Sequence, residues 1–154
     1  QDTLAFQRAR QRGSRLFAIW TVDIVNREAR PPTEVTSASN AATMHPTWSP
    51  DGSRLAFVTV VHPEDQPERP SQSDIWVVDR HGNGLANLTQ DRFMNLYPAW
   101  AKDGSVYFVS NRSGVENLWA VSSRRTSSPT AGPEPDTGNI VSVPSDTGRL
   151  RESP

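Results

Sequence analysis

Cysteine is absent from this 154-residue chain, and that absence excludes disulfides, thiolate metal ligands and cysteine nucleophiles. No apolar run approaches the roughly 20 residues that a membrane-spanning helix needs. A dominant charge of one sign is also missing, because 16 basic and 17 acidic residues nearly cancel. No overall field therefore directs the protein to nucleic acid, and we expect no nucleic-acid partner.

Tryptophan, glycine and proline are what the chain has instead, with five, nine and thirteen residues respectively. No long stretch is rich in the alanine, leucine, glutamate and lysine that are typical of helical bundles. A chain of this length is the size of one domain and buries roughly 70% of its unfolded surface. The composition predicts an all-β fold with many turns.

One stretch of the sequence is almost repeated. HPTWSPDGSRLAF, residues 45–57, matches YPAWAKDGSVYF, residues 97–108, in a single register. The residues that recur at a separation of 52 are Pro46 and Pro98, Trp48 and Trp100, Asp51 and Asp103, and Gly52 and Gly104. Internal periods of roughly 20–50 residues are typical of solenoids and propellers.

A second shared element follows each copy. It reads SDIWVVD around Trp76 and ENLWAV around Trp119, and an earlier copy, AIWTVD, surrounds Trp20. The first copy carries about eight extra residues in the proline-rich loop 61–72. Without that loop the period is about 44 residues, which matches the roughly 40–45 of a four-stranded propeller blade. Two-helix repeats of similar length do not fit, because Asp-Gly turns and prolines would interrupt their helices.

The strands of one repeat can be predicted from its turns and apolar runs. Thr47-Trp48 begins the first strand, Asp51-Gly52 forms a tight hairpin turn, and Leu55–Val60 form the second strand. Because nearly every residue of that second strand is apolar, both of its faces must be covered. Ile75–Asp79 form the third strand and Leu85–Thr89 the fourth. Such meanders cover one another when they stack radially.

These motifs resemble a blade of a TolB-like, WD-type β-propeller repeat protein. The repeat of that family runs Pro-x-Trp-Ser-Pro-Asp-Gly, then Ile-Ala-Phe, then an Ile-Trp-Val strand, then Leu-Thr. The resemblance implies an open arc of about three blades, one complete and two partial, over residues 1–123. Its units are 1–43, 44–94 and 95–123, and the first lacks its innermost strand. Ala101-Lys102 replaces Ser-Pro in the third unit, a change confined to a surface turn.

The C-terminal part of the chain differs in composition. Residues 124–154 form a linker and extension rich in serine, proline and glycine. Within it, residues 139–152 predict either a β-hairpin or an irregular tail, because NIVSVP resembles the opening of a third strand and DTG resembles a turn.

Few residues carry a chemical signature. His45, His62 and His81 share no ligand-like spacing, and zinc needs three or four converging ligands. The sequence contains no Gly-x-Ser-x-Gly elbow, no glycine-rich phosphate loop and no calcium loop with alternating carboxylates. We therefore expect no catalytic residue, no cofactor and no metal. The recurrence of tryptophan at repeat positions indicates packing between blades rather than a ligand cage.

The one concentrated charge feature is a run of arginines between the second and third strands of the first unit, Arg8, Arg10, Arg12 and Arg15. One interpretation is a solvated hairpin tip. The other is contact with an acidic partner or with anionic lipid headgroups, where each cation contributes ~1 kcal/mol.

An open arc has consequences for function. Propellers close into rings of about four to eight blades, so three blades leave two apolar end faces without a neighbouring blade. The first hypothesis is a non-catalytic protein–protein interaction module, an accessory or scaffolding subunit of a larger extracytoplasmic, periplasmic or membrane-associated complex. The second is a fragment of a tricorn-like or prolyl-oligopeptidase-like hydrolase whose catalytic domain lies elsewhere. The third is a head-to-tail homodimer that completes one ring.

Overall fold

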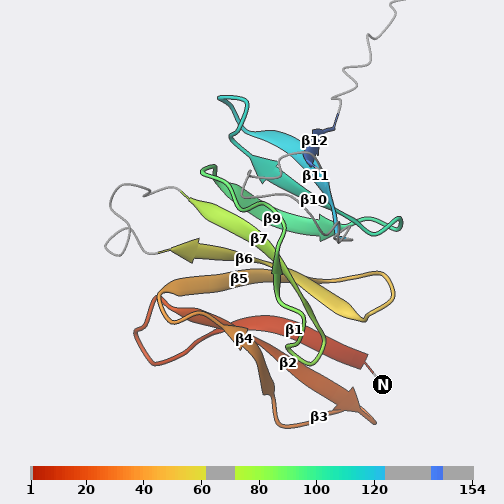
Figure 1. The fold of residues 1–154 in the computed structure, drawn as a ribbon. Coiled ribbons are helices and arrows are strands. Elements are labelled where there is room, and N and C mark those ends of the chain that lie inside the picture. Colours follow the sequence, from red (N-terminus) through yellow and green to blue (C-terminus); the bar gives the residue numbers. More distant parts are fainter. Residues whose placement is uncertain (1, 62–71, 124–139, 144–154) are drawn as a thin grey trace, which may run out of the picture.

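The computed structural model describes residues 2–61, 72–123 and 140–143. In these ranges the chain forms β-strands joined by turns, and no helix could span a membrane. The strands make three antiparallel sheets of four strands that stack face to face in chain order (Figure 1). Their bounds are β1 (Asp2–Ala9), β2 (Phe17–Val25), β3 (Glu28–Ala29), β4 (Thr33–Ser37), β5 (Ala41–Trp48), β6 (Arg54–Val61), β7 (Ser73–Asp79), β8 (Ala86–Asn87), β9 (Asn95–Trp100), β10 (Ser105–Ser110), β11 (Asn117–Ser122) and β12 (Ile140–Ser142).

One cross-strand pair fixes the equivalence of the three sheets. Phe6 lies opposite Trp20, Phe57 opposite Trp76, and Phe108 opposite Trp119. Aromatic pairs of this kind stabilise a sheet by roughly 0.2–1 kcal/mol relative to alanine pairs. Strands β1, β6 and β10 therefore occupy one position, and β2, β7 and β11 the next.

The first sheet has no strand in the innermost position. Strands β3 and β4 both pair with β2, whereas β1 has β2 as its one partner among the described strands. In the second and third sheets that inner position is filled by β5 and β9, which pair with β6 and β10. The missing inner strand of the first unit is thus a feature of the structure.

The inner strands begin earlier than the turn pattern predicts. Strand β5 starts at Ala41 rather than at Thr47, because a register shift between Met44 and Thr47 lets the strand continue through a bulge. His45 therefore lies within the strand and not before it. A comparable shift interrupts the pairing of β9 with β10 between Tyr107 and Val109.

The fourth strands differ from the prediction as well. Strand β8 covers Ala86–Asn87 instead of 85–89, because the Asn87 side chain accepts hydrogen bonds from the Thr89 and Gln90 amides and ends the strand. In the third sheet, Ile140–Ser142 pair with β11 and occupy the fourth position. The sequence predicted either a hairpin or an irregular tail over 139–152, and residues 139 and 144–152 lie outside the described residues.

Two hydrophobic clusters hold the stack together, one on each face of the second sheet. Leu55 and Phe57 of β6 face the first sheet and pack with Ile19, while Ala56 and Val58 face the third sheet. All four residues of this run are at most 1% exposed. This arrangement confirms that a strand apolar on both sides is covered on both sides.

The Asp-Gly turns and the Leu-Thr motif of the repeat have local explanations. Gly52 adopts a φ of 67°, and the Asp51 carboxylate accepts hydrogen bonds from Ser49 and Ser53, which lower its pKa to about 2. The Thr89 hydroxyl accepts from the Ile75 amide and donates to the Asp74 carboxylate, linking β7 to the chain beyond β8. Burial raises the pKa of Asp74 despite this hydrogen bond.

Candidate interaction surfaces

The outer face of the third sheet carries residues equivalent to those on the face of the second sheet that packs against the third. In the second sheet, Ala56, Val58, Ile75 and Val77 form the surface that packs against the third. The cross-strand registers place four residues at the same positions one sheet later, namely Tyr107, Val109, Leu118 and Ala120. No further described sheet stacks on this side of the third sheet, and Ala120 alone of the four is buried, at 7% exposure. We call this set the trailing face.

The trailing face is apolar and partly open to solvent. Leu118 is 44% exposed, and Val141, which pairs with Ala120 from β12, is 60% exposed. Tyr107 and Val109 are half-buried. Their neighbours along β10, Val106 and Phe108, are completely buried against the second sheet, as the alternation of a strand requires.

The first sheet presents the complementary surface at the other end of the stack. Its outward residues are Leu4, Phe6, Trp20 and Val22. They are equivalent to Leu55, Phe57, Trp76 and Val78 of the second sheet, which the first sheet covers. We call this set the leading face. Leu4 is 57% exposed. The Trp76 indole donates to the Thr59 hydroxyl, whereas the buried Trp20 indole nitrogen has no acceptor among the described residues.

A strained aromatic pair lies on the two inner strands. His45 on β5 and Tyr97 on β9 occupy the same repeat position and have φ angles of 53° and 56°. Positive φ is uncommon outside glycine, and such strain clusters at binding sites. The two rings are 5.1 Å apart between centroids, and Tyr97 is 60% exposed. The sequence signal for both is the residue before each repeated proline, a position to which the sequence analysis assigned no role.

Comparison with solved structures assigns the fold. The chain superposes on a TolB-type protein from Agrobacterium tumefaciens with a TM-score of 0.59 at 21% identity, over 79% of this chain. It also superposes on a puromycin-hydrolysing peptidase from Mycobacterium tuberculosis with a TM-score of 0.57 at 21% identity, over 86% of this chain.

The chain has the fold of a TolB-like partial β-propeller. Each sheet is one blade, and the prediction of an all-β arc of about three blades is confirmed. No family model matches the sequence. The chain spans 42% of the Agrobacterium protein and 21% of the Mycobacterium peptidase, so it corresponds to a part of either structure.

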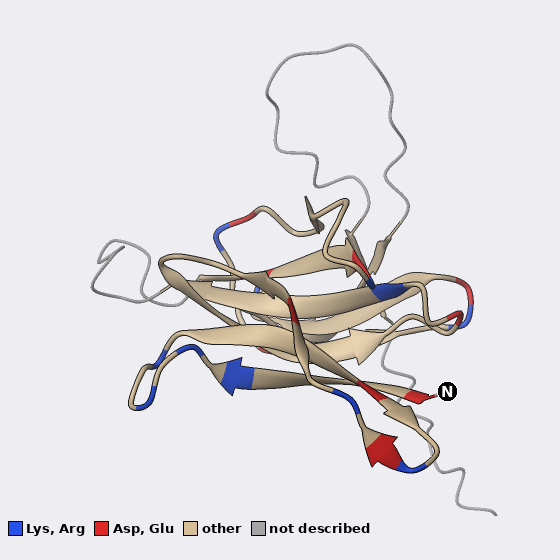
Figure 2. Cartoon of the chain, turned by 90° about the horizontal axis from the view of Figure 1, so that it is seen from below, with Lys and Arg blue, Asp and Glu red and all other residues tan. Residues whose placement is uncertain are grey.

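The predicted arginine cluster lies at the end of β1, which contains Arg8, and in the turn that joins β1 to β2 in the first blade (Figure 2). Arg8 stacks over Trp20 with its guanidinium carbon 5.2 Å from the ring centroid, and Arg10 donates to the Ala38 carbonyl at 3.2 Å. Arg12 and Arg15 are exposed. Two of the four cations are thus held by the first blade, and the contact with an acidic partner or with lipid remains a prediction.

The tryptophans of the repeat lie between blades. Trp100 donates from its indole nitrogen to the Thr47 carbonyl of the preceding blade at 3.1 Å, and Arg54 of that blade covers its ring at 5.0 Å. Trp48 packs against the cluster between the first two blades. Pro98 is buried and Pro46 is half-buried. Gly104 has a φ of 87° in the second Asp-Gly turn, where the Asp103 carboxylate accepts from the Ser105 amide.

Sequence reasoning missed a buried ion pair between the second and third units. Arg112 donates to the Asp91 carboxylate at 2.7 Å, and the two side chains are 10% and 8% exposed. Arg112 also donates to the Asn95 side chain, which in turn binds the Ser73 carbonyl of the second blade. Burial lowers the pKa of Arg112, and the charge of Asp91 opposes that shift. This network joins the second and third blades at one end of their interface.

The histidines do not converge. His45 lies on β5, His81 lies in the turn after β7, and His62 is outside the described residues. Within the described ranges, no three His, Cys, Asp or Glu side chains are grouped as metal ligands would be.

Proposed function

We propose that this chain is a non-catalytic protein–protein interaction module, an accessory or scaffolding part of a larger assembly. The observation that carries the proposal is the repeat register at the two ends of the arc. The residues that seat one blade on the next recur on the trailing face and on the leading face, where no described strand covers them. A partner with a β-sheet surface of the same kind fits both faces.

The energetics support an occupant for these faces. Fully burying a leucine side chain contributes roughly 1.5–3 kcal/mol. Leu4 and Leu118 are each about half exposed, at 57% and 44%, so each has apolar area left to bury. Contiguous apolar patches of this kind mark interaction sites on soluble proteins.

The setting of the assembly is inferred from resemblance. TolB-type propellers commonly serve envelope complexes, so we place this chain in an extracytoplasmic, periplasmic or membrane-associated complex. The exposed Arg12 and Arg15 would each add ~1 kcal/mol of attraction near an anionic surface.

A second candidate function follows from the peptidase comparison. The superposed region covers 21% of the Mycobacterium peptidase. In this alternative the arc is the propeller part of a hydrolase, and catalysis belongs to a separate domain. Labelling of the native protein by a fluorophosphonate probe for serine hydrolases would favour this alternative over a non-catalytic assembly.

Substituting Leu118 by arginine is expected to break the assembly. The charge would have to be buried unpaired against an apolar surface, which costs several kcal/mol. Native mass spectrometry of the protein isolated at its natural level should show wild type above the mass of one copy of the chain, bound to its partner, and the variant at the mass of the lone chain.

Val115→Arg is the matched control for this experiment. Val115 is 65% exposed, but it lies in the loop between β10 and β11 and not on the trailing face. Its variant should keep the wild-type mass, and thermal melting should show that both variants fold. A wild-type protein that is stable and monomeric at the mass of one chain would contradict the proposal, while a mass of two chains would identify the partner as a second copy.

A further inference from the structure

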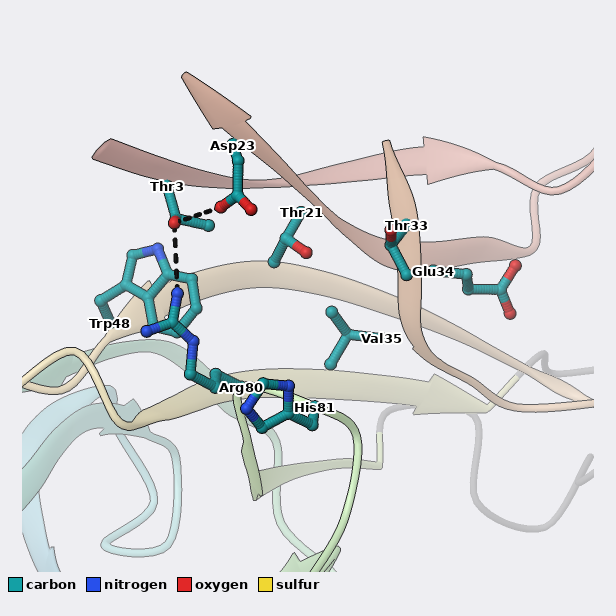
Figure 3. Close-up of a pocket in the computed structure, with 9 residues that line it drawn as sticks. All are labelled: Thr3, Thr21, Asp23, Thr33, Glu34, Val35, Trp48, Arg80 and His81. Carbon is teal, nitrogen blue, oxygen red and sulfur yellow. Dashed lines mark hydrogen bonds between the residues drawn. The ribbon is translucent and has the colours of Figure 1, made fainter. Parts of the chain in front are cut away.

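A polar cavity of about 220 Å³ lies between the first and second blades (Figure 3). The residues that line it are Thr3, Thr21, Asp23, Thr33, Glu34 and Val35 from the first blade and Trp48, Arg80 and His81 from the second. Interfaces between stacked sheets are normally closed by interdigitating side chains. A cavity lined by hydroxyls and charges therefore needs an explanation.

The equivalent position between the second and third blades contains no threonine. Asp23 and Asp79 occupy the same repeat position, and their cross-strand partners are Thr3 and Arg54. Thr3 is therefore the equivalent of Arg54 in the next blade. By the same registers, Thr21 replaces Val77 and Thr33 replaces Ala86. Three positions of the repeat have changed to threonine in the first blade, and all three line the same cavity.

Each of the two interfaces between blades contains an arginine over a tryptophan ring, but the arginine comes from the preceding blade in one and from the following blade in the other. Between the second and third blades, Arg54 lies 5.0 Å over Trp100 and donates two hydrogen bonds to Ser123. Between the first and second blades, the arginine comes from the Ser123 position: Arg80 lies 6.0 Å from the Trp48 centroid.

Arg80 leaves part of this crevice unfilled. Arg80, on the second blade, donates a hydrogen bond of 3.3 Å to the Thr3 hydroxyl. The short Thr3 side chain does not fill the space that Arg54 fills between the second and third blades. The exchange of arginine and hydroxyl between the two blades thus accounts for the cavity.

The polar groups around the cavity have hydrogen-bonding capacity to spare. The Thr3 hydroxyl donates to Asp23 Oδ1 at 2.6 Å and accepts from Arg80 Nη2, so one hydroxyl joins two opposite charges that make no direct ion pair. In the described part of the chain, the hydroxyls of Thr21 and Thr33 have no hydrogen-bond partner. Thr21 points toward the centre of the cavity in Figure 3, as does the Asp23 carboxylate.

We propose that this cavity binds a small zwitterion of the free α-amino acid class. Its ammonium group would bind Asp23, its carboxylate would bind Arg80, and the threonine hydroxyls would take the remaining donors and acceptors. The volume is below the roughly 300–1,000 Å³ of sites for drug-sized ligands, which suits a single amino acid. A neutral polyol would remove water from the charged groups of Asp23 and Arg80 without supplying a counter-charge to either, and this desolvation disfavours its binding.

A titration followed by two-dimensional NMR tests the proposal. The probes are the free L-amino acids, with an N-acetyl amino acid, an amino acid amide and glycerol as controls that lack one or both charges. We expect saturable shifts at residues around the cavity for at least one free amino acid and at least tenfold weaker binding for every control. Absence of saturable shifts up to about 10 mM would overturn the proposal, as would equal binding of glycerol.

Three variants sharpen the test. Thr3→Arg restores the residue that closes the next interface, so it should fold and abolish binding. Asp23→Asn should weaken binding at least tenfold through loss of the ammonium contact. Thr36→Val, on the same strand as Thr33 but outside the cavity, should bind as wild type does. Wild-type binding by folded Thr3→Arg would overturn the assignment of this cavity as the site.

Discussion

Replacing Arg112 by alanine is expected to lower the free energy of unfolding by about 3–5 kcal/mol, the typical cost of removing one partner of a buried ion pair. The Asp91 side chain is 8% exposed in the wild-type structure, and the variant leaves its carboxylate without its counter-charge. It also removes the donor to Asn95 and the cation that lies 5.1 Å from the Trp119 ring centroid. A loss of this size is a large part of the stability of a typical domain.

Urea denaturation followed by tryptophan fluorescence measures this loss, with Arg92→Ala as the matched control. Arg92 and Arg112 both lie 5.6 Å from the centroid of the Phe93 ring, but Arg92 is exposed. The control should stay within about 0.5 kcal/mol of wild type. Equal effects of the two substitutions would show that the buried pair does not hold the second and third blades together.

Gly82→Ala is expected to destabilise the protein by about 2–4 kcal/mol, combining backbone strain and overpacking. Gly82 has a φ of 88°, which side chains rarely adopt. A Cβ atom there would lie 2.5 Å from the carbonyl oxygen of Val35, on β4 of the neighbouring blade. Because the atoms that this Cβ would meet are the carbonyl oxygen and carbon of the Val35 backbone, the first and second blades would have to separate.

Gly84→Ala is the matched control, because it carries the backbone strain without the overpacking. Gly84 lies in the same turn with a φ of 65°, and a Cβ atom there would meet nothing within 4 Å. Its variant should lose about 1 kcal/mol from backbone strain alone. If both variants melt at the same urea concentration, the close approach of this turn to β4 contributes nothing to stability.

The repeat could be predicted from sequence because its signals are local. The Asp-Gly turns, the apolar strand Leu55–Val60 and the recurring Trp76 and Trp119 each depend on neighbours within a few residues. The separation of 52 residues then placed the units in register. Fold class and the missing inner strand of the first blade followed directly.

The polar features were beyond the same reasoning, because they depend on how distant strands meet. Asp91 and Arg112 are 21 residues apart and lie in separate turns, so nothing local marks them as a pair. The strain at His45 and Tyr97 arises from bulges in the inner strands. The three threonines of the cavity stand out from the repeat only when the cross-strand registers of the first and second blades are compared.

The central claim is that the end faces of the arc are covered by a partner, and hydroxyl-radical footprinting of the native protein tests it most directly. Tyr107 and Leu118 on the trailing face should be protected from oxidation in the native state and become reactive after mild dissociation. Val115, which is 65% exposed in a loop, should react equally in both states. Strong oxidation of Tyr107 and Leu118 in the native protein, at the level of Val115, would contradict the account.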